Sequence, residues 1–134
     1  MRLTQEKYRG NPWKIFVTCL MLNKTAGRVA NPIIEEFLRR WPTPAEYAKS
    51  ARKSEVLRLI RPLGLYNVRL ERLDKLASSL AERVPYDQIP GIGKYGRDAY
   101  LIFVEGRKDV LPEDEKLKGY LDEQRERARK KEFR

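Results

Sequence analysis

Two glycines and the basic residues beside them form the stretch of this sequence best suited to binding an anion. Gly91 and Gly93 are separated by one apolar residue, and a helical pattern begins directly after them. Glycine permits backbone conformations that other residues avoid, and a helix start leaves several N–H groups unpaired. Such a turn suits phosphate, and Lys94 and Arg97 add positive charge. An ordinary connection between two helices explains the glycines equally well, because short glycine motifs give many false positives.

The acidic side chains best placed for catalysis lie in the segment 112–115, which reads Pro-Glu-Asp-Glu. The sequence has no histidine, so acid–base chemistry at neutral pH falls mainly to carboxylates. Acids in the first turn of a helix also suit the helix dipole, so helix initiation alone explains Asp114. The single cysteine, Cys19, lies in an apolar run that is typical of a core position. It excludes a four-cysteine iron–sulfur cluster, and we expect no metal held by side chains.

The charge of the chain favours a polyanionic partner. Its 134 residues include 29 basic and 19 acidic side chains, for a net charge of +10. Nucleic acid is favoured over a membrane surface, although an ordinary basic protein is also compatible with this charge. The length predicts one domain over 1–134, with a flexible start at 1–10 and a charged tail at 122–134. The apolar run 15–22 is too short to cross a membrane, so we expect no membrane partner.

Apolar residues recur at helical spacing through most of the chain, and this pattern predicts an all-α fold. Asn11 as N-cap and Pro12 in the first turn begin the first helix. A second helix is predicted over 27–41, and Pro32 is expected to bend or break it. The apolar stripe of this second helix is expected to consist of Val29, Ile33, Phe37 and Trp41.

Later helices and turns position the candidate segments. A long helix over 66–84 is expected to carry Arg69 on its outer face with other charged residues. Before it, a turn contains two leucines, Leu63 and Leu65, which either fold into the core or project outward for a purpose. The final stretch from Asp122 is an exposed helix end or a frayed basic tail.

Four short strings in a fixed order resemble the helix-hairpin-helix DNA glycosylases. They are most similar to the G:T mismatch thymine/uracil glycosylase domain of the methyl-CpG-binding-domain protein, and the resemblance covers about Gln5 to Tyr120. Four strings in the right order are far more specific than any one of them. The strings are Asn11-Pro12-Trp13-Lys14, Pro62-Leu63-Gly64-Leu65-Tyr66, Gly91-Ile92-Gly93-Lys94-Tyr95-Gly96 and Pro112-Glu113-Asp114.

This resemblance implies a compact helical glycosylase fold and hydrolysis of the N-glycosidic bond of a flipped nucleotide. It implies that Asp114 stabilises positive charge on the sugar and orients or deprotonates the attacking water. Gln5 and Tyr95 would contact the extruded thymine or uracil. Lyase relatives carry a Schiff-base lysine at the position of Tyr95, so the resemblance implies a monofunctional enzyme that leaves an abasic site.

The other implied roles concern the DNA itself. Leu65 would enter the duplex as a wedge, and Lys24 would fill the gap left by the flipped nucleotide. Lys24 replaces the family's usual arginine and Glu115 its usual histidine, which bears on the efficiency of the reaction. In the family the hairpin carbonyls also bind a monovalent cation. The expected contacts to the DNA backbone are Gly91, Gly93, Lys94 and Lys116.

Two classes of function follow from the sequence. The first is a mismatch-specific glycosylase of base excision repair, acting as a monomer on double-stranded DNA without a required cofactor. It would be nuclear in a eukaryote and otherwise cytoplasmic. The second is a non-catalytic helix-hairpin-helix module that only binds the DNA backbone. Within the first class, the enzyme could also be a glycosylase for another lesion, which is a third possibility. The glycine turn and the charge fit all of these, whereas only a glycosylase accounts for Gln5, Leu65, Tyr95 and Asp114 together.

Overall fold

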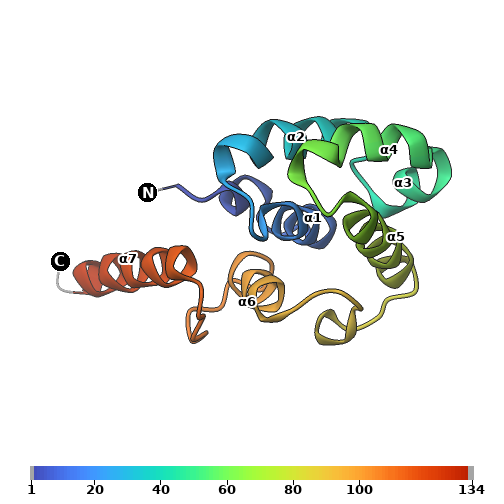
Figure 1. The fold of residues 1–134 in the computed structure, drawn as a ribbon. Coiled ribbons are helices and arrows are strands. Elements are labelled where there is room, and N and C mark those ends of the chain that lie inside the picture. The colour runs from blue at the N-terminus through green and yellow to red at the C-terminus, as the bar shows by residue number, and fades with distance from the viewer. Residues whose placement is uncertain (1, 133–134) are drawn as a thin grey trace.

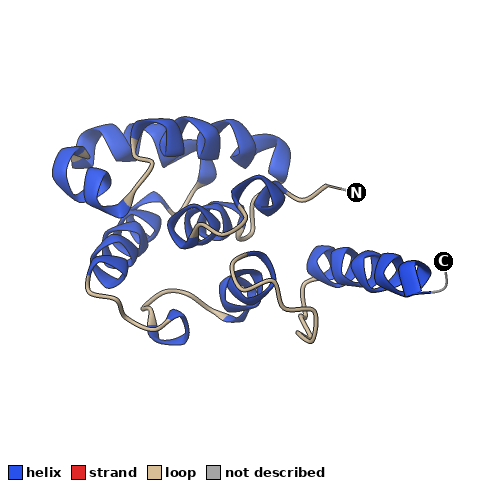
Figure 2. Ribbon diagram, turned by 180° about the vertical axis from the view of Figure 1, so that it is seen from behind, coloured by secondary structure: helices blue, strands red, loops and turns tan. Residues whose placement is uncertain are grey.

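The computed structural model describes residues 2–132, and these form helices joined by turns, with no strand in that range (Figure 2). The all-α prediction is therefore confirmed. Three of the helices are short 3-10 helices, here labelled η. The elements in chain order are η1 (Thr4–Tyr8), α1 (Pro12–Leu22), α2 (Gly27–Arg40), α3 (Pro44–Ser50), α4 (Lys53–Ile60), η2 (Arg61–Leu63), α5 (Tyr66–Ala81), η3 (Tyr86–Gln88), α6 (Lys94–Phe103) and α7 (Glu115–Glu132).

Helix α1 is the central element. It is buried almost all round from Trp13 to Met21, which suits a helix enclosed by other helices. Figure 1 shows it between α2 and α4 on one side and α6 on the other. One of its faces packs against α2 to α5, with Phe16 in that cluster. The other packs against α6 and α7, with Ile15 and Cys19 in the second cluster.

The start of α1 follows the predicted capping chemistry. The Asn11 side chain accepts a hydrogen bond from the Lys14 amide at 3.0 Å, and Pro12 occupies the first helical position. Trp13 then reaches across the core, and its indole N–H donates to the Trp41 carbonyl at 2.9 Å. The entry to α1 is thus fixed at both the backbone and the core.

Helix α2 differs from its prediction in two respects. It continues through Pro32, so of the expected bend or break the break is wrong, and the bend stays a prediction. Its buried positions are Ala30, Ile34, Phe37 and Leu38, whereas Val29 is 38% exposed and Ile33 is half-buried. Steps of four residues drift around a helix of 3.6 residues per turn, so a strict four-residue stripe leaves the core face.

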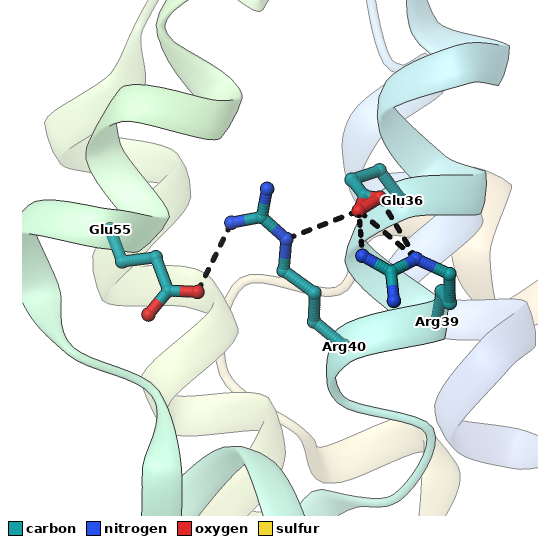
Figure 3. A network of polar contacts seen from close by, with 4 residues as sticks. All are labelled: Glu36, Arg39, Arg40 and Glu55. Carbon is teal, nitrogen blue, oxygen red and sulfur yellow. Dashed lines mark hydrogen bonds and ion pairs between the residues drawn. The ribbon is translucent and has the colours of Figure 1, made fainter.

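Ion pairs connect the end of α2 with α4. Arg40 lies between two carboxylates, with its Nη1 3.1 Å from Glu55 and its Nε 3.3 Å from Glu36 (Figure 3). Arg39 also binds Glu36. Exposed pairs of this kind contribute little to stability, about 0 to 1 kcal/mol each. The aromatic cluster beneath them, in which Trp41 and Tyr47 meet edge to face, supplies most of the packing here.

The beginning of the chain is ordered by tertiary contacts. A flexible start is expected for 1–10, but Thr4–Tyr8 form the helix η1. Thr4 Oγ1 donates to Asn31 Oδ1 of α2 at 2.8 Å, and the Gly10 amide donates to the Phe103 carbonyl of α6 at 2.9 Å. η1 is therefore held between two helices that are distant in sequence.

Helix α7 continues to Glu132, so through that residue the charged C-terminal segment is an exposed helix end. Leu117, Tyr120 and Leu121 anchor its first half in the second apolar cluster, and the rest projects from the body (Figure 1). Residues 133–134 of the predicted tail, like residue 1, lie outside the described residues. Within 2–132, no helix combines the length and the apolar character that a membrane crossing requires.

Candidate active site

An open pocket of about 530 Å³ lies where η1, the end of α1 and the starts of α6 and α7 meet. The lining residues are far apart in sequence, between Arg2 and Leu117, so only the fold brings them together. Six residues that the sequence singled out lie in this lining, namely Gln5, Lys24, Tyr95, Asp114, Glu115 and Lys116. A second hollow of about 450 Å³, bordered by α3, α4 and α5, contains none of them.

Gln5 and Tyr95 form a hydrogen-bonded pair at the inner end of this pocket. Gln5 is 2% exposed, and its amide nitrogen lies 2.6 Å from the Tyr95 hydroxyl and 3.7 Å from Cys19 Sγ. Burial raises the pKa of the Cys19 thiol to about 12, and burial also raises the pKa of Tyr95. Both groups are therefore neutral at physiological pH. With the amide nitrogen engaged, the Gln5 carbonyl oxygen is left as an acceptor.

Asp114 is the N-cap of α7. Its Oδ2 accepts a hydrogen bond from the Leu117 amide at 3.0 Å, and its carbonyl accepts one from Lys118 at 2.9 Å. Asp114 therefore does cap a helix, which is one of the two explanations that the sequence offered for it. Among the described residues, none donates a hydrogen bond to Oδ1, which stays available on the half-buried side chain. Capping therefore fixes the orientation of the carboxylate and leaves one oxygen able to accept a hydrogen bond from a ligand or a water molecule.

The glycine turn between η3 and α6 has the geometry expected of a hairpin. Gly91 has a φ of +84°, a value that residues other than glycine rarely adopt. A Cβ at this position would also lie 2.8 Å from Arg72 Cγ. Ile92 between the glycines is buried and anchors the turn in the core. Gly93 is the N-cap of α6, and no side chain of the described residues caps that helix. The first amides of α6 are thus open to an external acceptor.

The two lysines expected at the DNA backbone have different surroundings. Lys94 Nζ lies 2.8 Å from the Asp98 carboxylate and donates to the Leu111 carbonyl at 3.1 Å, so it ties α6 to the segment before Asp114. It does not line the pocket, which Tyr95 does. Lys116 is exposed in the first turn of α7 and lines the pocket mouth.

The two leucines of the second loop point to opposite environments. Leu63 is buried against the first apolar cluster, whereas Leu65 is 63% exposed. Leu65 also has a φ of +46°, a left-handed conformation that costs a residue with a Cβ about 1–2 kcal/mol. We call residues 63–65 the Leu65 turn. An exposed apolar side chain held in a strained conformation is typical of a functional position.

Lys24 occupies a similar position after α1. It is exposed, lies beside the pocket and has a φ of +59°. The Thr25 amide donates to the Leu22 carbonyl at 3.0 Å and closes the turn around it. We call residues 22–25 the Lys24 turn. Both residues that the sequence assigned to insertion into DNA therefore have left-handed backbones.

Arg69 is a residue near the candidate site that the sequence placed wrongly. It was expected on the outer face of α5, but it is 5% exposed. Its guanidinium donates only to carbonyls and one hydroxyl, from the end of α1, the Lys24 turn and the Leu65 turn. Burial lowers the pKa of Arg69, yet a guanidinium stays protonated. The prediction placed Arg69 outside because it is charged. The helical pattern of α5 could not show that other segments supply hydrogen-bond acceptors for a buried guanidinium.

Comparison with known proteins identifies the family of the chain. The model of the HhH-GPD superfamily of base excision DNA repair proteins matches residues 17–130. A methyl-CpG-binding domain protein 4-like protein of Arabidopsis thaliana is 35% identical over 123 residues, 90% of this chain and 27% of the relative. A thymine/uracil-DNA glycosylase of Pyrobaculum aerophilum is 36% identical over 111 residues, 76% of this chain and 48% of the relative.

A solved structure described as a thermostable thymine-DNA glycosylase aligns with 80% of this chain and 53% of its own, at a TM-score of 0.69 and 27% identity. The chain thus spans between about a quarter and about a half of the length of the relatives that it matches.

Proposed function

The chain belongs to the HhH-GPD superfamily of base excision DNA repair proteins, and on that basis we propose that it is a monofunctional glycosylase that removes thymine or uracil mispaired with guanine. The observation that carries the proposal is the convergence of Gln5, Tyr95 and Asp114 on one pocket. A module that only grips DNA needs no such pocket. We further propose that it acts as a monomer on double-stranded DNA.

The inner end of the pocket suits the edge of an extruded pyrimidine. The Gln5 carbonyl oxygen can accept from the N3–H that thymine and uracil share, and the Tyr95 hydroxyl can donate to a neighbouring base carbonyl. Since both Cys19 and Tyr95 stay neutral, no negative charge of theirs opposes the departing base. The hydrogen-bonded pair therefore supports recognition as well as departure of the base.

Asp114 would act on the sugar. Breaking the N-glycosidic bond develops positive charge on the sugar and negative charge on the base, and a nearby carboxylate stabilises the former. Oδ2 is committed to the α7 amide, so Oδ1 is the oxygen that would face the sugar and orient or deprotonate the attacking water. Water is the nucleophile in this scheme, because Tyr95 stands at the lyase position and Lys94 is bound to Asp98.

The DNA contacts would surround this pocket. The amides at the start of α6, beside Gly91 and Gly93, would bind a phosphate, and the net charge of +10 favours association. Lys94 and Lys116 remain proposed backbone contacts. The cation expected at the hairpin stays a prediction: Arg97 Nη1 already donates to the Ile92 carbonyl at 3.2 Å, and no step of the proposed reaction uses an ion there.

The proposal is tested with single-turnover assays on labelled duplexes that differ in one pair, G:T, G:U or A:T. Alkali-dependent strand breaks at G:T and G:U, with none at A:T, are the expected result. Breaks without alkali would reveal lyase activity and contradict the role given to Tyr95. Salt-sensitive binding without any break would favour the DNA-gripping module or another lesion, and duplexes with an A:G or an oxidised pair separate those two.

A further inference from the structure

We propose that Arg69 is a positioning residue that joins the Lys24 turn and the Leu65 turn into one rigid edge, so that both side chains enter the duplex together. This inference rests on the proposed glycosylase function, because that function gives the two turns their roles. Arg69 itself is buried in α5 and cannot touch DNA from its position.

The first half of the argument concerns the Lys24 turn. Arg69 Nη1 donates to the carbonyls of Leu20 and Met21, which lie in the last turn of α1 and have no helical partner of their own. A cation is favoured there because the C-terminus of a helix carries partial negative charge. Nη2 then donates to the Asn23 carbonyl and to Thr25 Oγ1, each at 3.0 Å. These two acceptors flank Lys24 on both sides.

The second half concerns the Leu65 turn. Arg69 Nε donates to the Gly64 carbonyl at 2.9 Å, and Nη2 lies 3.5 Å from the Leu63 carbonyl. The peptide that precedes Leu65 is thereby fixed. One guanidinium thus binds residues next to both left-handed positions. The two turns that it joins are far apart in the sequence.

Arginine is suited to this role for a geometric reason. Its planar group carries five N–H donors in fixed directions, and these reach acceptors on three segments at once. A lysine has its donors on a single atom and cannot span the same set. No carboxylate within residues 2–132 pairs with Arg69, whose hydrogen-bond acceptors there are all uncharged dipoles. Burying a charge on dipoles alone is costly. The rigidity that Arg69 confers on the two turns explains why the protein buries this charge despite its cost.

The decisive variant is Arg69→Lys, assayed on a G:T duplex with 2-aminopurine beside the mismatch. We expect its Kd for the duplex to stay within about threefold, since the contact surface is unchanged. The rise in 2-aminopurine fluorescence and the single-turnover rate should fall about 10- to 100-fold, as expected when inserting groups are misplaced by about 1 Å. Arg39→Lys, an equal change on the exposed end of α2, should match the wild type.

A milder variant covers the case in which Arg69→Lys does not fold. Thr25→Val keeps the shape of the side chain but removes the hydroxyl, which accepts from Arg69 and also donates to the Asn23 carbonyl at 3.4 Å. We expect a loss of about threefold to tenfold in flipping and rate. Circular dichroism and thermal unfolding establish that each variant is folded at the assay temperature.

A double-mutant cycle separates positioning from general stability. In a Lys24→Ala, Leu65→Ala background the two turns have lost their inserting side chains. Arg69→Lys and Thr25→Val should then change the rate by no more than about twofold. An equal loss in both backgrounds, or folded variants with wild-type flipping, would overturn the inference. A wild-type protein that neither flips nor cleaves would instead refute the proposed function itself.

Discussion

The proposed base pocket and the proposed insertion edge, formed by the Lys24 turn and the Leu65 turn, are built on opposite principles. In the pocket, the buried Gln5 and the half-buried Tyr95 are hydrogen-bonded to each other, and neither has a positive φ. At the edge, the working side chains are exposed and their backbones are left-handed. The pocket therefore needs fixed polar geometry, whereas the edge needs mechanical support from beneath, which Arg69 supplies.

The contrast has an energetic consequence. Loss of a buried polar partner should affect both stability and chemistry, because the remaining group is left unpaired. Loss of an exposed side chain at the edge should affect activity alone and can even relieve strain. Variants that separate stability from activity therefore test the contrast directly.

The largest effect is expected at Asp114. Asp114→Asn should lower the single-turnover rate at G:T about 100-fold or more, since the amide can neither stabilise the cation nor take a proton. Asparagine is as good an N-cap, so the thermal midpoint and the affinity for the mismatch should hardly change. Glu113→Gln, the same change one residue earlier on an exposed side chain, is the matched control and should keep wild-type activity. Loss of binding with unchanged turnover would contradict the assigned role.

At the edge, Leu65→Ala should lower the G:T rate about 10- to 100-fold, because the wedge offsets an unstacking cost of a few kcal/mol. Leu65→Gly should lose as much activity and raise the free energy of unfolding by about 1 kcal/mol, since glycine tolerates the positive φ. Leu65→Met should retain most activity. Kinetics and urea unfolding on the same samples provide the measurements, and a destabilised Leu65→Gly would show that the turn is not strained.

In the pocket, Tyr95→Phe removes one hydroxyl and leaves the buried Gln5 amide short of a partner. We expect about a tenfold lower rate at G:T, the value of one hydrogen bond, together with about 1–3 kcal/mol of lost stability. Tyr66→Phe, on an exposed residue beside the edge, is the control for the loss of a hydroxyl. A lower rate with an unchanged free energy of unfolding would mean that the pocket tolerates an unpaired amide. The pocket and the edge would then not differ in how their side chains contribute to stability.

The smallest effect is a pH dependence of stability. The pKa of Cys19 rises from 9.0 to about 12 on folding, so above pH 9 the folded state holds a proton that the unfolded state releases. This contribution is complete below pH 9 and is lost as the pH rises toward 12, by up to about 1.4 kcal/mol per pH unit. Between pH 9 and 10, Cys19→Ala should therefore show a shallower decline than the wild type in urea titrations. Parallel curves would mean that the thiol is not held neutral.

Much of the fold followed from local patterns. Asn11 and Pro12 predicted the start of α1, and the glycines of the hairpin predicted the break before α6, because capping and positive φ are local requirements. Predictions failed where distant segments supplied the partners. η1 forms because Thr4 meets Asn31, and Arg69 is buried because three other segments offer it acceptors.

The candidate site shows the same division. The residue types of the glycosylase strings, including Tyr95 where lyases have lysine, are fixed by the order of the amino acids alone. The sequence offered both a wedge and a core position for Leu65, and both a catalytic role and a cap for Asp114. The tertiary structure exposed Leu65, gave Asp114 the cap with one free oxygen, and joined Gln5 to Tyr95 across the chain. Burial and hydrogen-bond partners are properties of the packed chain, so only the packed chain could decide them.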